Sequence, residues 1–247
     1  RDQTGAYLEY QGRFADGLYI TAGLRQDDNE DFGNHSSFRL SAAWVRPMAG
    51  GELKLKSSLG TGFRAPSLYE VSYNRGPFAF APAAGTDLDE ETSEGYDLGV
   101  AWASDAGSYF ELTWFDQSVD DLITFDPLGF SGYVQDAGRS DSRGTGLVID
   151  TPLTERFRLV ANYTWNETET PGGAQRPFRP EHVANLGLAW ADSAQRLRLG
   201  LNLRSSSDAV DAAGETLDDY VLLDLNASYR VASGLVVYGR LENALDE

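Results

Sequence analysis

Hydrophobic and polar residues alternate strictly along the segment from Gln195 to Arg204, which reads QRLRLGLNLR. Leucine occupies every second position from Leu197 to Leu203, and the positions between hold arginine, glycine and asparagine. A period of two predicts a β-strand, because successive side chains leave opposite faces of the backbone. Such a strand separates an apolar phase from an aqueous one. The two phases are either the core and the solvent of a soluble sandwich, or lipid and water.

Segments with the same alternation recur along the whole chain and predict about twelve strands. They form six pairs: 4–14 with 18–27, 36–46 with 52–62, 91–103 with 108–126, 132–151 with 156–168, 180–191 with 195–206, and 219–230 with 235–244. Short turns such as Asp16-Gly17 join the members of each pair, and longer polar connections join one pair to the next, at 28–35, 64–90, 127–131, 169–179 and 207–218. Short turns at one end and longer connections at the other are typical of outer-membrane barrels.

Aromatic residues recur on the apolar faces at one depth, one to three residues before a short turn. They are Phe14, Trp44, Trp102, Trp190 and Tyr229. Amphipathic rings at a fixed depth form the aromatic girdle of a membrane interface, so we expect these five residues to lie at a membrane boundary. The alternative is a set of ordinary core aromatics near strand ends.

The composition excludes several classes of protein. The chain has 247 residues, a net charge of −18 and no cysteine, which excludes a disulfide scaffold and a thiolate metal site. The acidic balance argues against a nucleic-acid partner, because phosphate binding needs a basic face. No run of about 18 apolar residues predicts a transmembrane helix. The mean hydropathy of −0.37 is that of a soluble protein, but in a barrel only every second residue faces lipid.

The two ends of the sequence both fall in strand pattern. The chain opens at Arg1 without an initiator methionine, and its last residues continue a strand. We therefore expect 1–247 to be a single barrel domain truncated at both ends. The absence of a targeting signal then says nothing about location.

Acidic residues gather in the long connections, in the segments 27–31, 87–91 and 208–219. They indicate either a solvated rim or cation binding at this end of the sheet. The first segment is similar to the start of an EF-hand calcium loop. However, its glycine is one place late, at Gly33, and Phe38 stands where glutamate is required. We therefore expect no metal site of that type.

Signals for enzymatic chemistry are weak. The only histidines are His35 and His182, and the sequence contains no nucleophile elbow, P-loop or H-E-x-x-H motif. We expect no catalytic residue and no cofactor. Two alternatives from other classes stay open: an outer-membrane barrel hydrolase that uses His182 with a serine or acidic partner, and a soluble carbohydrate-binding β-sandwich.

The polar faces of the predicted strands carry charges of both signs. Five arginines are candidates to face the interior of a barrel: Arg156, Arg158, Arg196, Arg198 and Arg204. Acidic residues such as Asp150 and Asp224 share the predicted face. Mixed charge suits a polar plug or a water-filled passage better than a packed apolar core. The alternative is ordinary solvent exposure on an open sheet.

The segment from Gly60 to Glu70, GTGFRAPSLYE, resembles the G-x-[GS]-[FY]-[KR]-A-P-x-L motif of TonB-dependent outer-membrane receptors, especially their cobalamin-receptor-like branch. Further similarities follow in the family's order: 85–96 is similar to N-P-x-L-x-P-E and the next strand, 133–144 to Y-x-N-x-G-x-A-x-x-[KR]-G, 224–229 to the penultimate hairpin, and 242–246 to E-N-L-F-D. The chain departs from these motifs at Thr86, Asp87, Glu90, Ala244 and Leu245, so the 85–90 loop is expected to differ in shape.

This resemblance implies an all-β, antiparallel transmembrane β-barrel, of which the chain supplies about twelve strands, numbers 10 to 21 of 22, without the plug domain. It implies a monomeric receptor in the outer membrane of a Gram-negative bacterium, surrounded by lipid. Such a receptor binds a scarce small-molecule nutrient, cobalamin or a ferric siderophore. It imports the nutrient with energy from TonB and its inner-membrane complex, which act through the missing N-terminal part.

Ligand contacts are expected in the connection 71–86, at Tyr73, Asn74, Arg75, Phe78 and Phe80. Aromatic and amide groups there can stack on a large ligand and form hydrogen bonds with it. The alternative is a loop that only covers the rim.

Overall fold

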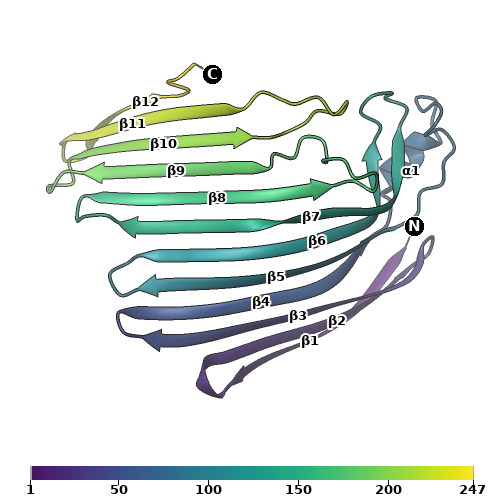
Figure 1. Cartoon of the computed structure of the whole chain (residues 1–247), viewed down its shortest axis with the longest axis horizontal. Helices are drawn as coiled ribbons and strands as arrows, with labels where there is room; N and C mark the ends of the chain where they lie inside the picture. Colours follow the sequence, from purple (N-terminus) through teal and green to yellow (C-terminus); the bar gives the residue numbers. More distant parts are fainter. Residues whose placement is uncertain (1, 247) are drawn as a thin grey trace.

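The computed structural model describes residues 2–246, and within that range the chain forms twelve strands in one antiparallel sheet whose spatial order follows the sequence (Figure 1). The strands are β1 (Gln3–Phe14), β2 (Leu18–Asn29), β3 (Gly33–Met48), β4 (Gly51–Arg64), β5 (Glu91–Ser104), β6 (Tyr109–Phe125), β7 (Tyr133–Pro152), β8 (Phe157–Glu169), β9 (His182–Ala191), β10 (Leu197–Ser207), β11 (Tyr220–Ala232) and β12 (Leu235–Leu241). β1 and β12 are the two edges, so the sheet is open. The expectation of an all-β, antiparallel fold is confirmed.

Two helical segments accompany the sheet. A single 3₁₀ turn, η1 (Ala15–Gly17), joins β1 to β2, and the helix α1 (Leu68–Asn74) lies in the connection between β4 and β5. No helix among residues 2–246 is both long and apolar enough to cross a bilayer.

The helix α1 was not expected from strand periodicity. Pro66 ends the extended segment that follows β4, and Ser67 caps the helix by accepting a hydrogen bond from the Glu70 backbone N–H. The Glu70 carboxylate in turn accepts a hydrogen bond from the Ser67 backbone N–H, which completes a capping box. The sequence signal was therefore present as Ser67-x-x-Glu70 after a proline.

The connection expected at 28–35 is much shorter in the structure. β2 and β3 stay paired as far as Asn29 and Gly33, which leaves only Glu30 to Phe32 outside the strands. The Asn29 side chain accepts hydrogen bonds from the backbone N–H groups of Asp31 and Phe32. Gly33 takes a φ of 78°, which glycine adopts without strain. The expectation of a long connection here was wrong, because local turn chemistry closes the hairpin.

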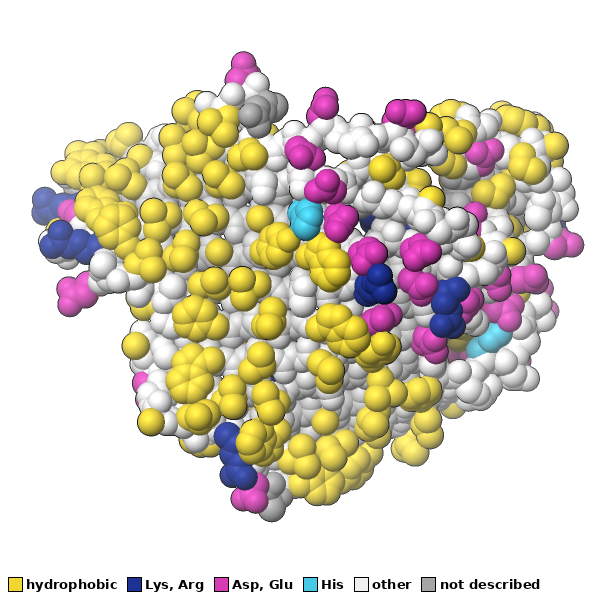
Figure 2. Space-filling view, in the orientation of Figure 1, with side chains coloured by type: hydrophobic (Ala, Val, Ile, Leu, Met, Phe, Trp, Pro, Cys, Tyr) yellow, Lys and Arg dark blue, Asp and Glu magenta, His cyan; other side chains and the backbone are white. Residues whose placement is uncertain are grey.

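One face of the sheet is apolar and remains open. In the β9–β11 region, Leu201 lies opposite Leu188 on one side and Leu225 on the other, which makes a leucine row across three strands. Apolar side chains cover most of the face seen in Figure 2, and charged side chains gather at the end where α1 lies. Among the described residues, the buried hydrophobic ones are only Ala83, Leu88, Ala101 and Ile123.

A soluble β-sandwich buries such a face under a second sheet. Residues 2–246 form one sheet only, and its leucines and aromatic rings stay exposed. The soluble carbohydrate-binding sandwich is therefore not supported.

We predict that a lysine substitution is harmful on the apolar face and tolerated on the polar face. Leu201→Lys puts a charge on the apolar face, where it costs about 2–4 kcal/mol at the middle of a bilayer. Asn202→Lys is the matched control, because Asn202 lies opposite Asp224 on the polar face. In the full-length protein, the amount of heat-modifiable, folded protein in the membrane should fall for Leu201→Lys only. An equal loss in both variants would contradict this orientation.

Candidate functional site

Ion pairs bridge adjacent strands, or strands separated by one other, on the face opposite the leucines. Lys56 pairs with Glu111 at 2.7 Å, and Arg158 pairs with Asp150 at 2.7 Å. The hydroxyl of Ser58 donates a hydrogen bond to Asp97 on the same face. The mixed charge predicted for this face thus consists largely of paired residues.

The five arginines expected to face the interior fall into two groups. Strand register puts Arg158, Arg198 and Arg204 on the polar face, and Arg204 contacts Asp224 at 3.4 Å. Arg156 lies in the short turn between β7 and β8, and Arg196 lies in the turn between β9 and β10. The three strand positions lie on the polar face, and that this face lines a barrel interior stays a prediction. The two turn positions lie at the short-turn end of the sheet.

The aromatic residues expected at a membrane boundary all lie on the leucine face near short turns. Trp44 lies opposite Leu18 and Leu55, and Trp190 lies opposite Phe157 and Leu199. The Arg46 guanidinium stacks over the Trp44 ring at 5.1 Å, so a charge sits just beyond the ring. Their place in a membrane stays a prediction.

A second aromatic band lies on the same face toward the opposite end, and it was missed in the sequence. Its members are Tyr96, Trp114, Tyr163 and Trp165, of which the first two pack at 5.3 Å. Tyr96 and Trp102 are six residues apart on β5, which corresponds to roughly 20 Å along a strand. Two aromatic bands at about this spacing are typical of the apolar belt of a membrane barrel.

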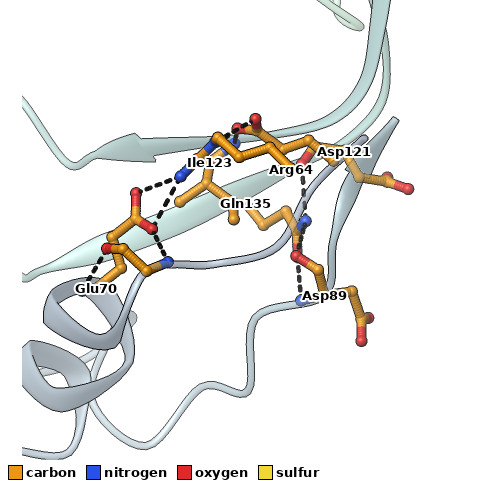
Figure 3. Close-up of polar contacts among 8 residues, drawn as sticks. Arg64, Glu70, Asp89, Asp121, Ile123 and Gln135 are labelled. Carbon is orange, nitrogen blue, oxygen red and sulfur yellow. Dashed lines mark hydrogen bonds and ion pairs between the residues drawn. The ribbon is translucent and has the colours of Figure 1, made fainter. Parts of the chain in front are cut away.

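A polar network at the long-connection end fixes α1 to the sheet (Figure 3). Arg64, the last residue of β4, donates two hydrogen bonds to Glu91, at 2.6 and 2.8 Å, and also bonds to Glu70 of α1 at 3.0 Å. Glu91 is buried and also accepts a hydrogen bond from the Ile123 backbone N–H at 2.6 Å. Arg64 thus joins β4, β5 and α1, and Glu91 extends the network to β6.

Glu70 is ionised in this network. Burial alone would raise its pKa, but hydrogen bonds from Ser67 and the contact with Arg64 outweigh burial and lower the pKa below its usual value. The capping box and the ion pair therefore act on the same carboxylate. The F-R-A-P-S-L-Y-E segment folds as it does because each polar group of Glu70 and Arg64 has a partner.

A β-bulge between β6 and β7 lies next to the Arg64 network. The register shifts between Asp120 and Leu122, and Asp121 has a φ of 58°. The Gln135 side chain then donates to the carbonyl oxygens of Asp121, at 2.7 Å, and Asp89, at 3.0 Å. Gln135 also accepts from the Asp89 backbone N–H, as Figure 3 shows. The segment that precedes β5 is thereby attached to the hairpin.

Asn74 makes the third attachment. Its amide accepts a hydrogen bond from the Tyr133 backbone N–H at 2.9 Å and donates one to the Tyr133 carbonyl at 2.8 Å. The residue is 1% exposed. A side chain at Gly132 would lie 2.7 Å from Asn74 Oδ1, so only glycine permits this close approach. Asn74 therefore holds α1 in place, and we do not propose it as a ligand contact.

Five aromatic rings pack together beside this attachment: Tyr69, Tyr73, Phe125, Phe130 and Tyr133. Neighbouring ring centroids are 5.3–6.3 Å apart, mostly edge to face. Tyr69 is 66% exposed and Phe130 is 64% exposed, so the cluster presents rings to the outside. Sequence analysis selected only Tyr73 from this cluster. Phe125 and Tyr133 meet Tyr73 through contacts far apart in the chain, and Tyr69, one helical turn before Tyr73, was missed because α1 was not expected.

The remaining residues expected to contact a ligand are exposed. Phe78 and Phe80 lie in the connection after α1, where they are 77% and 53% exposed. Arg75 pairs with Asp87 at 3.1 Å, and both side chains are exposed. The structure thus leaves Tyr73, Arg75, Phe78 and Phe80 as candidates, and it adds Tyr69 and Phe130.

The long-connection end carries a strong negative charge. The connections 30–32, 65–90, 126–132, 170–181 and 208–219 contain thirteen acidic residues: Glu30, Asp31, Glu70, Asp87, Asp89, Glu90, Asp126, Glu181, Asp208, Asp211, Glu215, Asp218 and Asp219. They contain three basic residues, Arg75, Arg176 and Arg179. Across residues 2–246, no group of three or more histidine and acidic side chains is arranged to hold a metal ion.

A cleft lies beside α1 in this acidic region. It has a volume of about 890 Å³ and is bounded by the β2–β3 turn, by α1 and by the segment before β5. Leu68, Val71 and Leu88 supply apolar lining, and Asp87, Asp89 and Glu90 supply carboxylates. A cleft of this size, with an apolar lining and a few polar groups, is typical of a small-molecule site.

The ring nitrogens of His182 contact an aromatic hydroxyl and a carboxylate. Its Nδ1 atom lies 2.7 Å from the Tyr163 hydroxyl, and its Nε2 atom lies 3.7 Å from Asp208. Both contacts lie on or next to the leucine face. Ser207 lies opposite His182 in the β9–β10 register, but its hydroxyl donates a hydrogen bond to Asp208 at 3.0 Å rather than to the His182 ring. The contacts of His182 therefore fix the end of β9.

Comparison with known proteins gives one family. A family model described as TonB dependent receptor-like, beta-barrel, matches residues 1–244. The chain is 25% identical over 271 residues to the iron-regulated outer membrane virulence protein of Vibrio cholerae, which covers 99% of this chain and 41% of that protein. It is 25% identical over 266 residues to the vitamin B12 transporter of Photobacterium profundum, and this alignment covers 100% of this chain and 40% of that protein.

The fold is found in solved structures as well. A mutant of the ferric enterobactin receptor of Pseudomonas aeruginosa superposes with a TM-score of 0.78 at 19% identity, over 99% of this chain and 40% of that one. The chain thus spans about two fifths of the length of the relatives named here.

We predict that Arg64→Gln loosens α1 from the sheet. The substitution leaves Glu70 and the buried Glu91 without their cation, which should cost about 1–2 kcal/mol after allowance for the half-exposed guanidinium. Hydrogen exchange of the amides in 68–74, measured on the full-length protein, should become roughly five- to thirtyfold faster. Arg75→Gln is the control, because the exposed pair with Asp87 contributes little. Equal acceleration in both variants would refute the role given to Arg64.

We also predict a pH dependence of α1 docking. The pKa of Glu70 is lower in the folded state than in the unfolded state, so its stabilisation is complete above the ordinary carboxylate range and is lost as the pH falls through the lowered pKa. Exchange protection of 68–74, corrected for the intrinsic rate, should stay constant from about pH 7 to 5 and decline below about pH 4. Glu70→Gln should remove this step. A decline that begins near pH 6 would show that another group controls the docking.

Proposed function

The chain belongs to the TonB-dependent receptor β-barrel family, and from this premise we propose that it forms part of the barrel wall of an outer-membrane receptor that imports a scarce nutrient. Members of this family bind small-molecule ligands and interact with TonB. The observation that carries the proposal is the division of one sheet into an exposed leucine face and an ion-paired polar face. A wall between lipid and an aqueous interior needs this division.

The proposed roles follow the two ends of the sheet. At the long-connection end, the exposed rings of Tyr69, Phe78, Phe80 and Phe130 would contact the ligand outside the cell. Aromatic rings stack on planar or apolar ligand surfaces at a low cost in conformational entropy. The Arg64 network and Asn74 hold these rings in place before the ligand arrives, which reduces the ordering cost of binding.

Transport would continue along the polar face. Arg158, Arg198 and Arg204 lie on it with Asp150 and Asp224, and paired charges keep such a wall hydrated without attracting one ion strongly. The energy would come from TonB and its inner-membrane complex, acting on parts of the receptor outside 1–247. No bond of the ligand is made or broken in this scheme, so we propose a receptor and not an enzyme.

The ligand class is proposed from the relatives. One is named a vitamin B12 transporter, and a structural neighbour is named a ferric enterobactin receptor. Cobalamin or a ferric siderophore is therefore the first choice for this chain. The contacts of His182 do not favour the hydrolase alternative, because its ring nitrogens meet Tyr163 and Asp208. The hydroxyl of Ser207, which lies opposite His182, donates to Asp208 instead of to the ring.

Uptake in whole cells tests the proposal. The full-length gene is expressed in a receptor-null strain, and uptake of labelled cobalamin and of labelled ferric siderophores is measured with and without a functional TonB. Accumulation of at least one ligand should depend on both the receptor and TonB, and a protonophore should abolish it. With the protein verified in the outer membrane, failure to accumulate any member of the panel would refute the proposal.

A further inference from the structure

The cleft beside α1 is a second surface of the same helix that carries the rings. Leu68, Val71, Ser72 and Arg75 face the cleft at helical spacing, and Tyr69 and Tyr73 belong to the ring cluster. The helix is held by Arg64 and Asn74, so both surfaces are fixed in relation to each other. A bound ligand could use the rings and the cleft together.

The charges that line the cleft are mostly negative. Asp31, Asp87, Asp89 and Glu90 contribute carboxylates, and Arg75 is the one base in the lining. Arg75 is already paired with Asp87 at 3.1 Å. The cleft therefore offers no uncommitted cation to an anionic ligand.

Asp89 is positioned for a partner from outside the chain. Gln135 holds its backbone on both sides, through the N–H and the carbonyl. Its carboxylate extends away from the Arg64 network (Figure 3). A side chain fixed through its own backbone and left open is ready to contact a ligand without prior rearrangement.

The long connections around the cleft also carry mostly negative charge. Thirteen acidic and three basic residues occupy the long connections. Hydrogen bonds from the Ser131 hydroxyl and the Gly129 backbone N–H lower the pKa of Asp126, next to the ring cluster. Of the two bases that do not line the cleft, Arg176 is half-buried and lies near Asp136 and Glu91. A field of one sign around a cleft attracts opposite charge and slows the approach of like charge.

We infer that the α1 cleft selects a ligand with a cationic group, which contacts Asp89 and Glu90 while its apolar body lies on Leu68, Val71 and the neighbouring rings. Ferric complexes with net negative charge should bind more weakly than cationic ones. This inference rests on the proposed import function and narrows its ligand class. A rim that is acidic only for solubility would lose the same charge preference whether acidic residues are removed inside the cleft or outside it.

Binding to the purified full-length receptor tests the inference with three iron complexes of graded charge. Ferrioxamine B carries a free ammonium group and is a cation, ferrichrome is neutral, and ferric enterobactin is a trianion. Affinity should fall in that order, by at least about tenfold from the first to the last at low ionic strength. Raising the salt concentration should narrow the difference. Equal affinities, or tightest binding of the trianion, would overturn the inference.

Two double substitutions test whether the preference for a cationic ligand arises in the cleft. Asp89→Asn with Glu90→Gln should weaken binding of ferrioxamine B by about fivefold or more and leave ferrichrome binding unchanged. Asp211→Asn with Glu215→Gln is the matched control, because it removes the same charge from the β10–β11 connection, outside the cleft lining. If the control variant weakens ferrioxamine B binding as much as the cleft variant, the cleft is not the site.

The uptake experiment separates this inference from the proposed function. TonB-dependent uptake of ferric enterobactin alone would overturn the cationic class and leave the receptor function intact. TonB-dependent uptake of ferrioxamine B would support both. Lack of TonB-dependent uptake for every ligand in the panel would refute the receptor function and this inference with it.

Discussion

Continuous pairing of backbone N–H and carbonyl groups between neighbouring strands is the constraint on which the rest of the structure depends. Lipid offers no hydrogen bonds, so a membrane-spanning strand must satisfy its backbone through its neighbours. The unbroken order from β1 to β12 meets this demand for every strand inside the sheet. Because pairing fixes the register, it also fixes which side chains meet on each face. The leucine row through Leu201 and the ion pair between Lys56 and Glu111 are both consequences of register.

The wall and the end proposed to bind the ligand are joined through a few polar residues. Arg64 belongs to a strand of the wall and bonds to Glu70 of the helix that carries exposed rings. Glu91 begins the next strand and receives both Arg64 and the Ile123 backbone. The helix thus owes its position to the sheet and not to its own length of seven residues, which is too short for stability alone. A rigid wall of this kind can hold a short loop helix ready for a ligand.

The local alternation of apolar and polar residues was sufficient to predict the strands, but it did not predict which residues form the candidate site. The period of two located all twelve strands, because each strand has one apolar and one polar face. The same approach passed over α1, although Ser67 and Glu70 spell a capping box. It selected Asn74 as a ligand contact, but the side-chain amide of Asn74 is hydrogen-bonded to the backbone of Tyr133, far along the chain. Tyr69 joins the ring cluster because the β6–β7 hairpin places Tyr133 beside α1. Contacts of long sequence separation leave no periodic signal.

The central claim is that alternate residues of each strand face lipid and water, and single-cysteine scanning of β10 tests it most directly. These 247 residues contain no cysteine, so each labelled position in this segment is unique. Spin labels at successive positions from Leu197 to Ser206, in the full-length receptor in membranes, would report access to oxygen dissolved in lipid and to a water-soluble nickel complex. The account predicts a strict alternation, with oxygen favoured at Leu197, Leu199, Leu201 and Leu203 and nickel favoured between them. Uniform accessibility, or an alternation of opposite phase, would contradict it.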